Sequence, residues 1–405
     1  MAMQAQKSEV FTCARIVTTY IIETIIQAVV FAIICLGWYI SVFKFGMGYL
    51  MYNQNKNHFA GVVYTITVSS VLQLLAAVHA HLCLGRTVHS VPDYEPPALD
   101  TLTEPYECLS DGTLDFCSKG SCNGRWKPPG THHCSTCGVC RLEFDHHCPW
   151  LGNCVTASRM KAFLCLLYAT AFVVPFAVIP VSGPLSGHLA TALRVSKVDP
   201  WAVRIWWSRW YSWVLCGGPL GRWVFGTFLG FRVLKAQDAA AHDRWWFQGN
   251  MVDSPHTLAA FIVTAGSVLA IFAVCMAVVT TRDVLLGRTT LDTIRARRPR
   301  NTGAGAPLMQ HTSRFVCIPT VTSSVASCSH SSGVQSRPKT DDSAQLDPPR
   351  RRVFEVLPGE RLYDLGWREN LRKVWASPLF DRVLPSEYSW PKINPAVLRR
   401  MKEHM

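Results

Sequence analysis

"YIIETIIQAVVFAIICLGWYISV", residues 20–42, is long enough and apolar enough to cross a bilayer as one helix, since a span needs about 20 residues. Glu23 and Gln27 interrupt this run. Polar groups are costly in lipid, so both should face other helices or a polar cavity. Similar runs follow at residues 60–84, 163–181 and 258–280. A buried helix of a large soluble core could explain one such run but accounts poorly for four. The sequence therefore predicts an all-α polytopic membrane protein with four transmembrane helices.

The composition agrees with a membrane protein, because 49% of the 405 residues are hydrophobic and only 17% are charged. The first apolar run is too long, and begins too far from the N-terminus, for a cleavable signal peptide. The net charge of +13 would suit a nucleic-acid ligand. However, Lys and Arg mostly flank the apolar runs, so we expect anionic lipid headgroups or a polyphosphate ligand and no nucleic acid.

The chain is expected to fall into four parts. A hydrophilic Cys/His-rich segment separates the second span from the third, and Pro175 and Pro180 predict a kink or a broken end in the third. A stretch rich in Ser, Pro and charge in the C-terminal region predicts a disordered linker. The parts are residues 1–84 with two spans, 85–162 with the Cys/His segment, 163–280 with two further spans, and 281–405 with the linker at about 301–350 and a compact block at 353–390.

The arginine cluster at residues 295–300 directly follows the fourth span. Positive residues beside a span favour the cytosolic side, so the C-terminus is expected in the cytosol. Four spans then place the N-terminus and the Cys/His segment on the same side. Basic residues between 185 and 255 argue against this topology, although long loops are weak evidence for orientation.

The connection between the third and fourth spans is rich in tryptophan. Residues 201–231 read "WAVRIWWSRWYSWVLCGGPLGRWVFGTFLGF", with Arg204, Arg209 and Arg222 among the aromatic residues. Aromatic rings and cations together are typical of a segment at headgroup depth, which we favour. A further membrane crossing, which would reverse the side of everything downstream, and a stretch absent from the mature protein are the alternatives.

Eight of the 16 cysteines fall between Cys108 and Cys154, interleaved with histidines. That clustering indicates metal ligation in a reducing compartment and not scattered disulfides. Cys134 and Cys137 form a close pair, and Cys117 and Cys122 form a looser one. Two such pairs imply two structural zinc ions and eight ligands. Eleven candidate ligands are present, so some must be spare. The candidates are Cys117, Cys122, His132, His133, Cys134, Cys137, Cys140, His146, His147, Cys148 and Cys154.

The segment "CNGRWKPPGTHHCSTCGVCRLEFDHHCPWLGNCV", residues 122–155, resembles the cysteine-rich domain of DHHC protein S-acyltransferases (palmitoyltransferases). The resemblance implies two zinc ions held in interleaved fashion, and it leaves Asp145, His146 and Cys148 free of metal. The first ligand set would be Cys117, Cys122, His133 and Cys140, and the second Cys134, Cys137, His147 and Cys154.

The metal-free residues have the chemistry of an activated nucleophile. A thiol reacts as its thiolate, so Cys148 needs a base. His146 can take the thiol proton, and Asp145 can hold the imidazole in the required tautomer. The ligand sets fill both tetrahedra, so zinc would be structural and would have no open position for a catalytic water.

Two further stretches are similar to motifs of the same family. "GRTTLDTIR", residues 287–295, resembles its Thr-Thr-x-Glu motif through Thr289, Thr290 and Asp292, with Asp in place of Glu. A rival copy stands at Thr280, Thr281 and Asp283. Residues 362–385 resemble the family's C-terminal block, in which Asn370 matches the key asparagine and is followed by Val374 and Trp375.

The chain also departs from the family pattern in several places. The first cysteine pair is separated by four residues instead of two. Pro129 and Gly130 stand where the family has a variable residue and an arginine, and Thr156 stands where glycine is usual. The first zinc site is the part of the resemblance that these departures affect most.

The resemblance implies an integral-membrane protein S-acyltransferase that works through an acyl-enzyme intermediate on Cys148. The donor would be palmitoyl-CoA or another long-chain acyl-CoA, and the acceptors would be proteins with membrane-proximal cysteines. We expect an endomembrane compartment (ER, Golgi or vacuole) or the plasma membrane, with a cytosolic active site. An inactive membrane scaffold that binds proteins through its zinc module is the main alternative, and a zinc-dependent hydrolase is a third.

Overall fold

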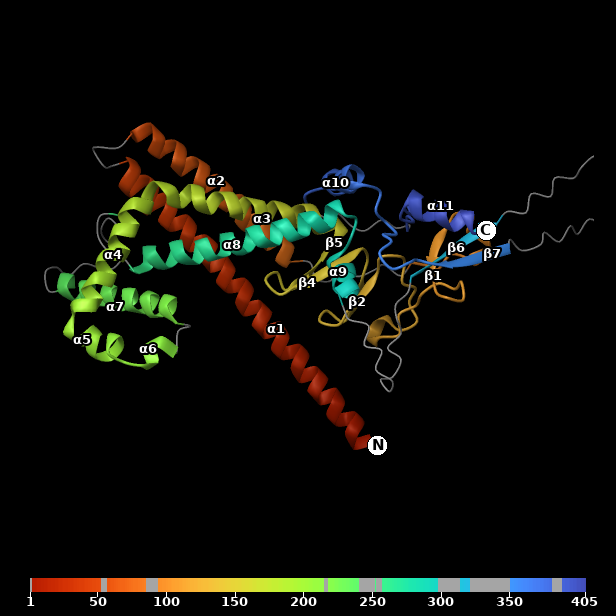
Figure 1. Ribbon diagram of the computed structural model, residues 1–405, viewed down its shortest axis with the longest axis horizontal. Helices are drawn as coiled ribbons and strands as arrows, with labels where there is room; N and C mark the ends of the chain where they lie inside the picture. The colour runs from red at the N-terminus through yellow and green to blue at the C-terminus, as the bar shows by residue number, and fades with distance from the viewer. Residues whose placement is uncertain are drawn as a thin grey trace, which may run out of the picture. The chain divides into compact units, whose positions relative to one another are not determined.

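The computed structural model describes residues 2–51, 57–84, 94–214, 218–239, 252, 257–297, 314–320, 350–380 and 388–405 (Figure 1). The chain divides into two compact units. The first comprises Met1–Gly85, Cys148–Asn153 and Lys161–Thr281, and the second comprises Arg86–His147, Cys154–Met160 and Arg282–Met405.

The first unit is mainly helical, apart from the short non-helical segment Cys148–Asn153. Its elements are α1 (Ala2–Tyr39), the π-helical η1 (Ile40–Met51), α2 (His58–Cys83), α3 (Ala157–Val178), the 3-10 turn η4 (Ile179–Val181), α4 (Ser182–Val198), α5 (Pro200–Ala202), the π-helical η5 (Val203–Trp207), α6 (Tyr211–Val214), α7 (Pro219–Ala239) and α8 (Thr257–Leu285).

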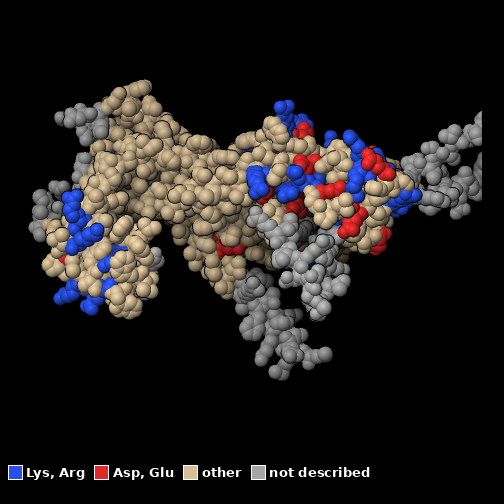
Figure 2. Space-filling view, in the orientation of Figure 1, with Lys and Arg blue, Asp and Glu red and all other residues tan. Residues whose placement is uncertain are grey.

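Among the described residues, four helices are long and apolar enough to cross a membrane, which confirms the four predicted spans. Their apolar side chains meet in a shared core, where Ile40, Val68, Val181 and Ile262 are buried together. Figure 2 shows hardly any charged side chains over α2, α3 and α8, whereas Lys and Arg gather over the α4–α7 helices. The spans are Thr18–Met51, His58–Cys83, Ala157–Val198 and Thr257–Leu285.

The third span is longer than predicted and is interrupted at its proline. Pro180 lies in the 3-10 turn η4, so the predicted break occurs there, while Pro175 stays inside α3. A helix end leaves backbone carbonyls without intrahelical partners. The Tyr64 hydroxyl of α2 donates to one of them, the Ala177 carbonyl, at 2.9 Å. The chain then continues as α4 beyond residue 181, where the sequence predicted the span to end.

The Trp-rich connection folds into helices that pack on α4. Helices α4 and α7 approach each other closely, and a Cβ added to Gly230 would lie 1.8 Å from the Ala192 carbonyl oxygen. Only glycine fits that contact. Arg222 lies over the rings of Trp207 and Trp213, with its guanidinium 5.2 and 4.2 Å from their centroids. Within the described residues α7 is not among the helices apolar enough to span a membrane.

The second unit mixes short helices with small sheets. Its elements are η2 (Leu99–Thr101), β1 (Tyr106–Cys108), η3 (Gly120–Cys122), β2 (His132–Cys134), β3 (Val139–Arg141), β4 (Phe144–Cys148), β5 (Asn153–Thr156), α9 (Thr290–Arg297), β6 (Phe315–Thr320), β7 (Arg350–Glu355), α10 (Trp367–Ala376) and α11 (Pro395–Glu403).

The strands correct the expectation of an all-α chain, although most of the chain is helical. They form a three-stranded sheet in the order β1-β6-β7 and two two-stranded sheets, β2-β3 and β4-β5. Four-ligand metal sites in small domains favour such short hairpins, because the ligand pairs must turn back on themselves. Strand β6 lies inside the interval 301–350, for which a disordered linker was expected. Its sequence "FVCIPT" is apolar, and Val316 and Cys317 are fully buried. The remainder of that interval, apart from residue 314 and the first residue of β7, lies outside the described residues.

Candidate functional site

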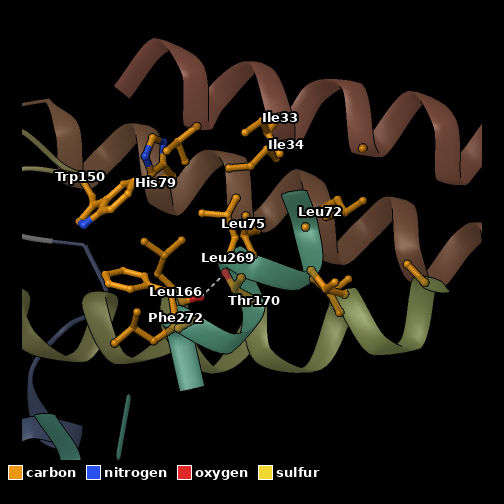
Figure 3. A pocket seen from close by; sticks show the side chains of 18 of the residues that line it. Ile33, Ile34, Leu72, Leu75, His79, Trp150, Leu166, Thr170, Leu269 and Phe272 are labelled. Carbon is orange, nitrogen blue, oxygen red and sulfur yellow. Dashed lines mark hydrogen bonds between the residues drawn. The ribbon is translucent and has the colours of Figure 1, made fainter. Parts of the chain in front are cut away.

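An apolar cavity of about 160 Å³ lies between the spans of the first unit (Figure 3). Aliphatic and aromatic side chains from α1, α2, α3 and α8 form most of its wall. Cys148 and Trp150 also line it, together with the polar side chains of Ser41, His79 and Thr170. A cavity with this lining suits a hydrocarbon chain, and it includes one thiol.

Cys148 lies at the end of strand β4, where a tight turn begins. The Leu151 N–H donates to the Cys148 carbonyl at 3.1 Å and the Gly152 N–H to the Pro149 carbonyl at 3.2 Å. Trp150 packs its ring against Phe272 of α8, with 5.1 Å between centroids. The thiol is therefore carried by a short turn whose aromatic residue is anchored to a membrane helix.

The alternation of strand β4 places two adjacent histidines on opposite faces of the strand. Successive side chains of a strand point to opposite faces, so residues two apart share a face. His146 and Cys148 therefore share one face of β4, and His147 points to the other. His147 is in a cluster that could hold a metal ion, and the thiol of Cys148 is in neither of the two such clusters found among the described residues.

The cluster around His147 has the dimensions of a zinc tetrahedron. Zinc bonds of about 2.3 Å to sulfur and about 2.1 Å to nitrogen give tetrahedral S···N edges of about 3.6 Å. The His147 Nδ1 lies 3.6, 3.5 and 3.6 Å from the Sγ atoms of Cys134, Cys137 and Cys154. These four residues are the predicted second ligand set, and the structure brings all of them together.

The second cluster contains three of the four residues of the predicted first ligand set. His133 Nδ1 lies 3.5 Å from Cys117 Sγ and 3.7 Å from Cys140 Sγ. Cys122 is not in this cluster, but its sulfur accepts the Cys140 N–H at 3.3 Å. Burial, helped by the charge of Lys119, lowers the pKa of His133 and favours the neutral ring that a metal binds. Both Cys/His clusters could hold a metal ion, and their donor sets fit zinc.

Asp145 organises a hydrogen-bond network behind the catalytic candidates. One of its oxygens lies 2.7 Å from His146 Nδ1. The Thr290 backbone N–H donates to the carboxylate at 2.9 Å, and the Thr290 hydroxyl donates at 2.7 Å. Asp145 is 5% exposed, so a buried carboxylate is fixed by three donors. The structure thus brings together two of the predicted site residues, Thr290 and Asp145.

Thr289 and Asp292 begin helix α9 with a capping box. The Asp292 N–H donates to the Thr289 hydroxyl at 3.1 Å, and the Thr289 N–H donates to the Asp292 carboxylate at 3.2 Å. This reciprocal pair starts the helix so that Thr290 reaches Asp145. The shorter Asp, where the family has Glu, is long enough for this role. In the rival copy, Thr281 instead bonds the Tyr168 hydroxyl at 2.6 Å.

Arg314 is a residue that the sequence reasoning missed. Its guanidinium lies 3.1 Å from Asp292 and 3.3 Å from Glu107. Burial opposes the charge, but Glu107 and Asp292 outweigh it and raise the pKa of Arg314 above its ordinary value. The arginine ties the capping box to strand β1. It stands in the expected linker, so no local signal pointed to it.

Asn370 fastens helix α10 to the end of α8. Its Nδ2 donates to the Leu285 carbonyl at 3.1 Å and to the Asp364 carboxylate at 2.8 Å. Gly287 closes α8 with φ +58°, and a Cβ there would lie 2.7 Å from the Asp364 Cα. The asparagine therefore satisfies a helix-end carbonyl next to the segment that carries Thr290.

Comparison with known proteins confirms the resemblance of the cysteine-rich segment. Residues 111–189 match the family described as DHHC palmitoyltransferase. The probable protein S-acyltransferase 13 of Arabidopsis thaliana is 53% identical over 55 residues, 14% of this chain and 17% of that protein. The palmitoyltransferase pfa3 of Emericella nidulans is 48% identical over 87 residues, 22% of this chain and 16% of that protein. Palmitoyltransferase spe-10 of Caenorhabditis elegans is 44% identical over 68 residues, 17% of this chain and 18% of that protein. The chain thus spans less than a fifth of the length of each of these relatives.

Proposed function

We propose that this chain, which carries a DHHC palmitoyltransferase domain, is a protein S-acyltransferase that moves a long-chain acyl group from acyl-CoA to cysteines of other proteins. The observation that carries the proposal is the presence of Cys148 in the wall of an apolar cavity between the spans. A thiol beside a hydrocarbon-lined cavity is suited to a substrate with a fatty tail and a reactive thioester. Each buried methylene contributes about 0.8 kcal/mol to binding of the tail.

The first step is attack by the Cys148 sulfur on the acyl-CoA thioester. A bond forms between Sγ and the acyl carbon, and the bond from that carbon to the CoA sulfur breaks. His146 takes the Cys148 proton and returns it to the departing CoA thiolate. Asp145 holds His146 through Nδ1, so proton transfer falls to Nε2. Asp145 also stabilises the charged ring after the transfer.

The second step transfers the acyl group to a protein cysteine. The acceptor sulfur attacks the acyl carbon, its proton passes through His146 to Cys148, and the thioester on Cys148 breaks. One thioester replaces another in both steps, so no nucleotide is consumed. Acceptor cysteines near the bilayer are the natural substrates, because Cys148 itself lies beside the membrane spans.

Two zinc ions would be structural in this enzyme. The first would be held by Cys117, Cys122, His133 and Cys140, and the second by Cys134, Cys137, His147 and Cys154. When bound, zinc supplies a rigid clamp for the hairpins that carry the catalytic residues. His147 lies directly between His146 and Cys148 in sequence, so a metal on His147 fixes the backbone of both.

The enzyme would be an integral protein of an endomembrane or the plasma membrane, with the site in the cytosol. The basic run that follows α8 supports this orientation by the positive-inside rule. A reducing cytosol also keeps the thiolate ligands and Cys148 free of disulfides.

Purified protein incubated with labelled palmitoyl-CoA tests the proposal. We expect a protein-bound label that hydroxylamine removes and that a Cys148→Ser variant lacks. A His146→Ala variant should load more slowly at unchanged metal content. Zinc-loaded wild-type protein with no acyl adduct would favour the inactive scaffold, and release of free fatty acid without an adduct would favour a hydrolase.

A further inference from the structure

The turn that carries Cys148 is attached to helix α1 by a glutamine of the first span. The Gln27 side chain donates through Nε2 to the Leu151 carbonyl at 3.0 Å. Gln27 stands in an apolar helix, where an amide costs free energy unless it is hydrogen-bonded. The sequence predicted only that Gln27 should face other helices or a polar cavity, and the structure assigns it a partner three residues from the thiol.

Helix α2 attaches the same turn through a buried histidine. The His79 imidazole hydrogen-bonds to the backbone of Trp150 and is 4% exposed. Its Nε2 also lies 3.6 Å from the Cys83 sulfur, one helical turn further along α2. Figure 3 shows His79 next to Trp150 at the cavity, among aliphatic side chains. The contact thus holds the residue two positions after Cys148.

The far end of the turn is also held by α2. Asn153 donates through Nδ2 to the Leu82 and Leu84 carbonyls, both at 3.1 Å. These carbonyls belong to the C-terminal end of α2, where intrahelical donors run out. Hydrogen bonds of α1 and α2 therefore reach Trp150, Leu151 and Asn153, all within five residues of Cys148.

We propose that Gln27 and His79 are positioning residues, which hold the Trp150–Leu151 backbone so that the Cys148 thiol stays in the cavity wall. The inference rests on the proposed acyl transfer. In an apolar surrounding few competing partners exist, so each of these hydrogen bonds fixes the backbone more firmly than the same bond in water. Neither side chain takes part in the bond changes at the thioester.

Positioning affects the rate of acyl loading more than the binding of acyl-CoA. A displacement of about 1 Å at a reacting atom can cost about 100-fold in rate. The cavity that would bind the acyl tail is formed mainly by other side chains, so the KM for palmitoyl-CoA should stay within about threefold. Loss of either contact should slow loading about 10- to 100-fold.

The test measures single-turnover loading of full-length, zinc-loaded protein with palmitoyl-CoA. Gln27→Met keeps the length of the side chain but removes the donor, and His79→Leu removes the imidazole. His79→Gln restores an N–H that can reach the Trp150 backbone. Gln73→Leu is the matched control, because Gln73 is an exposed glutamine of α2 whose donor bonds Ser69 of the same helix at 3.1 Å.

We expect Gln27→Met and His79→Leu to load slowly, with full burst amplitude, unchanged zinc content and nearly unchanged KM. His79→Gln should recover at least part of the rate, and Gln73→Leu should match wild type. A variant that merely misfolds would lose burst amplitude while its active fraction loads at the normal rate. That result for Gln27→Met would overturn the inference, and that result for His79→Leu alone would remove the positioning role of His79.

The inference and the proposed function fail in different ways. Absence of an acyl adduct in wild-type protein would remove the proposed function. Wild-type loading together with normal rate constants in Gln27→Met and His79→Leu would leave the function standing and remove the positioning role alone. If His79→Leu cannot be purified, the loading rates of Gln27→Met and His79→Gln test the inference. Slow loading by Gln27→Met is required in every case.

Discussion

Thr290 donates two hydrogen bonds to Asp145 across 145 residues of sequence, one from its backbone and one from its hydroxyl. Both reach the carboxylate that holds His146. Two donors on the outer side leave this carboxylate little freedom, so the imidazole that it orients is fixed as well. The C-terminal region thereby contributes to a candidate site whose other residues come from the Cys/His-rich segment.

Under the proposed function, removing the Thr290 hydroxyl should slow acyl loading and leave the zinc content unchanged. Thr290→Val keeps the backbone donor and the shape of the side chain but loses the 2.7 Å bond. We expect acyl loading from palmitoyl-CoA to fall about 10- to 100-fold, because a loosened Asp145 orients His146 less well. Zinc content should stay at the wild-type value.

Two variants serve as controls for Thr290→Val. Thr290→Ser retains a hydroxyl and should keep most of the rate. Thr264→Val makes the same chemical change on an exposed position of α8, where the hydroxyl bonds only its own helix. Equal loading rates for Thr290→Val and Thr264→Val would show that the hydroxyl does not support the site.

Truncation of Asn370 should destabilise the second unit. Asn370→Ala removes the donor to the Leu285 carbonyl and the acceptor for the Leu365 N–H, which lies at 3.1 Å. An unsatisfied buried group costs about 1–3 kcal/mol, so the midpoint of thermal unfolding should fall. Glu369→Ala, on the exposed side of the same helix, removes only a surface ion pair and should change it little. Equal midpoints of thermal unfolding for the two variants would show that the hydrogen bonds of Asn370 do not stabilise the second unit.

The spans could be predicted from the sequence because an apolar run is a local pattern, whereas the two metal-ligand sets were implied by the resemblance to the DHHC family. Four apolar runs predict four helices, and the break in the third span at Pro180 follows from the missing N–H of proline. All eight predicted ligands lie in or beside the two clusters, because cysteine and histidine spacing reflects the geometry of the hairpins. The assignment of zinc to these clusters remains a prediction.

Contacts between distant segments could not be predicted in the same way. The pairing of β6 with β1 and β7 depends on long-range hydrogen bonds, and low apolar content around residues 315–320 hid the strand. The ion pairs of Arg314 with Asp292 and Glu107 could not be predicted for the same reason. The hydrogen bonds from Gln27 to Leu151 and from His79 to Trp150 could not be predicted either, since the sequence of an apolar helix does not indicate which backbone group an amide or imidazole contacts.

The buried thiol of Cys108 provides a test of the second unit that does not involve metal. Burial, with a contribution from Cys317, raises the pKa of Cys108 to about 12. The thiol should therefore stay protonated at pH 8 and resist alkylation by iodoacetamide in the native protein. Mass spectrometry of the peptide should show modification only after unfolding, and rapid native alkylation would contradict the burial of β1.

The same shift predicts how stability depends on alkaline pH. The folded-state pKa lies above that of the unfolded chain, so the native state retains a proton that the unfolded chain loses. This contribution is complete below the ordinary thiol pKa and is lost as the pH rises toward about 12. The midpoint of thermal unfolding should therefore fall with rising pH more steeply in wild type than in Cys108→Ala. Parallel pH curves for the two proteins would show that Cys108 does not titrate in this way.

The zinc content of variants should distinguish the proposed ligand cysteines from the proposed nucleophile, Cys148. Cys134 lies in a cluster of four ligands, so Cys134→Ala leaves an incomplete tetrahedron and should lose zinc and acyl loading together. Cys148 is outside both clusters of the described residues, so Cys148→Ala should lose loading while it keeps the wild-type amount of zinc. Elemental analysis gives the zinc content of each purified variant relative to the same wild-type preparation.

Cys122 decides whether the first cluster has three ligands or four. Its sulfur accepts the Cys140 N–H, as a zinc-bound thiolate does, yet it is not among the three mutually close donors. If zinc draws it in, Cys122→Ala should lose about half of the bound zinc and keep the ion at His147, whereas Ser121→Ala next to it should lose none. Full zinc content in Cys122→Ala would leave the first site to Cys117, His133 and Cys140, with a fourth ligand other than Cys122.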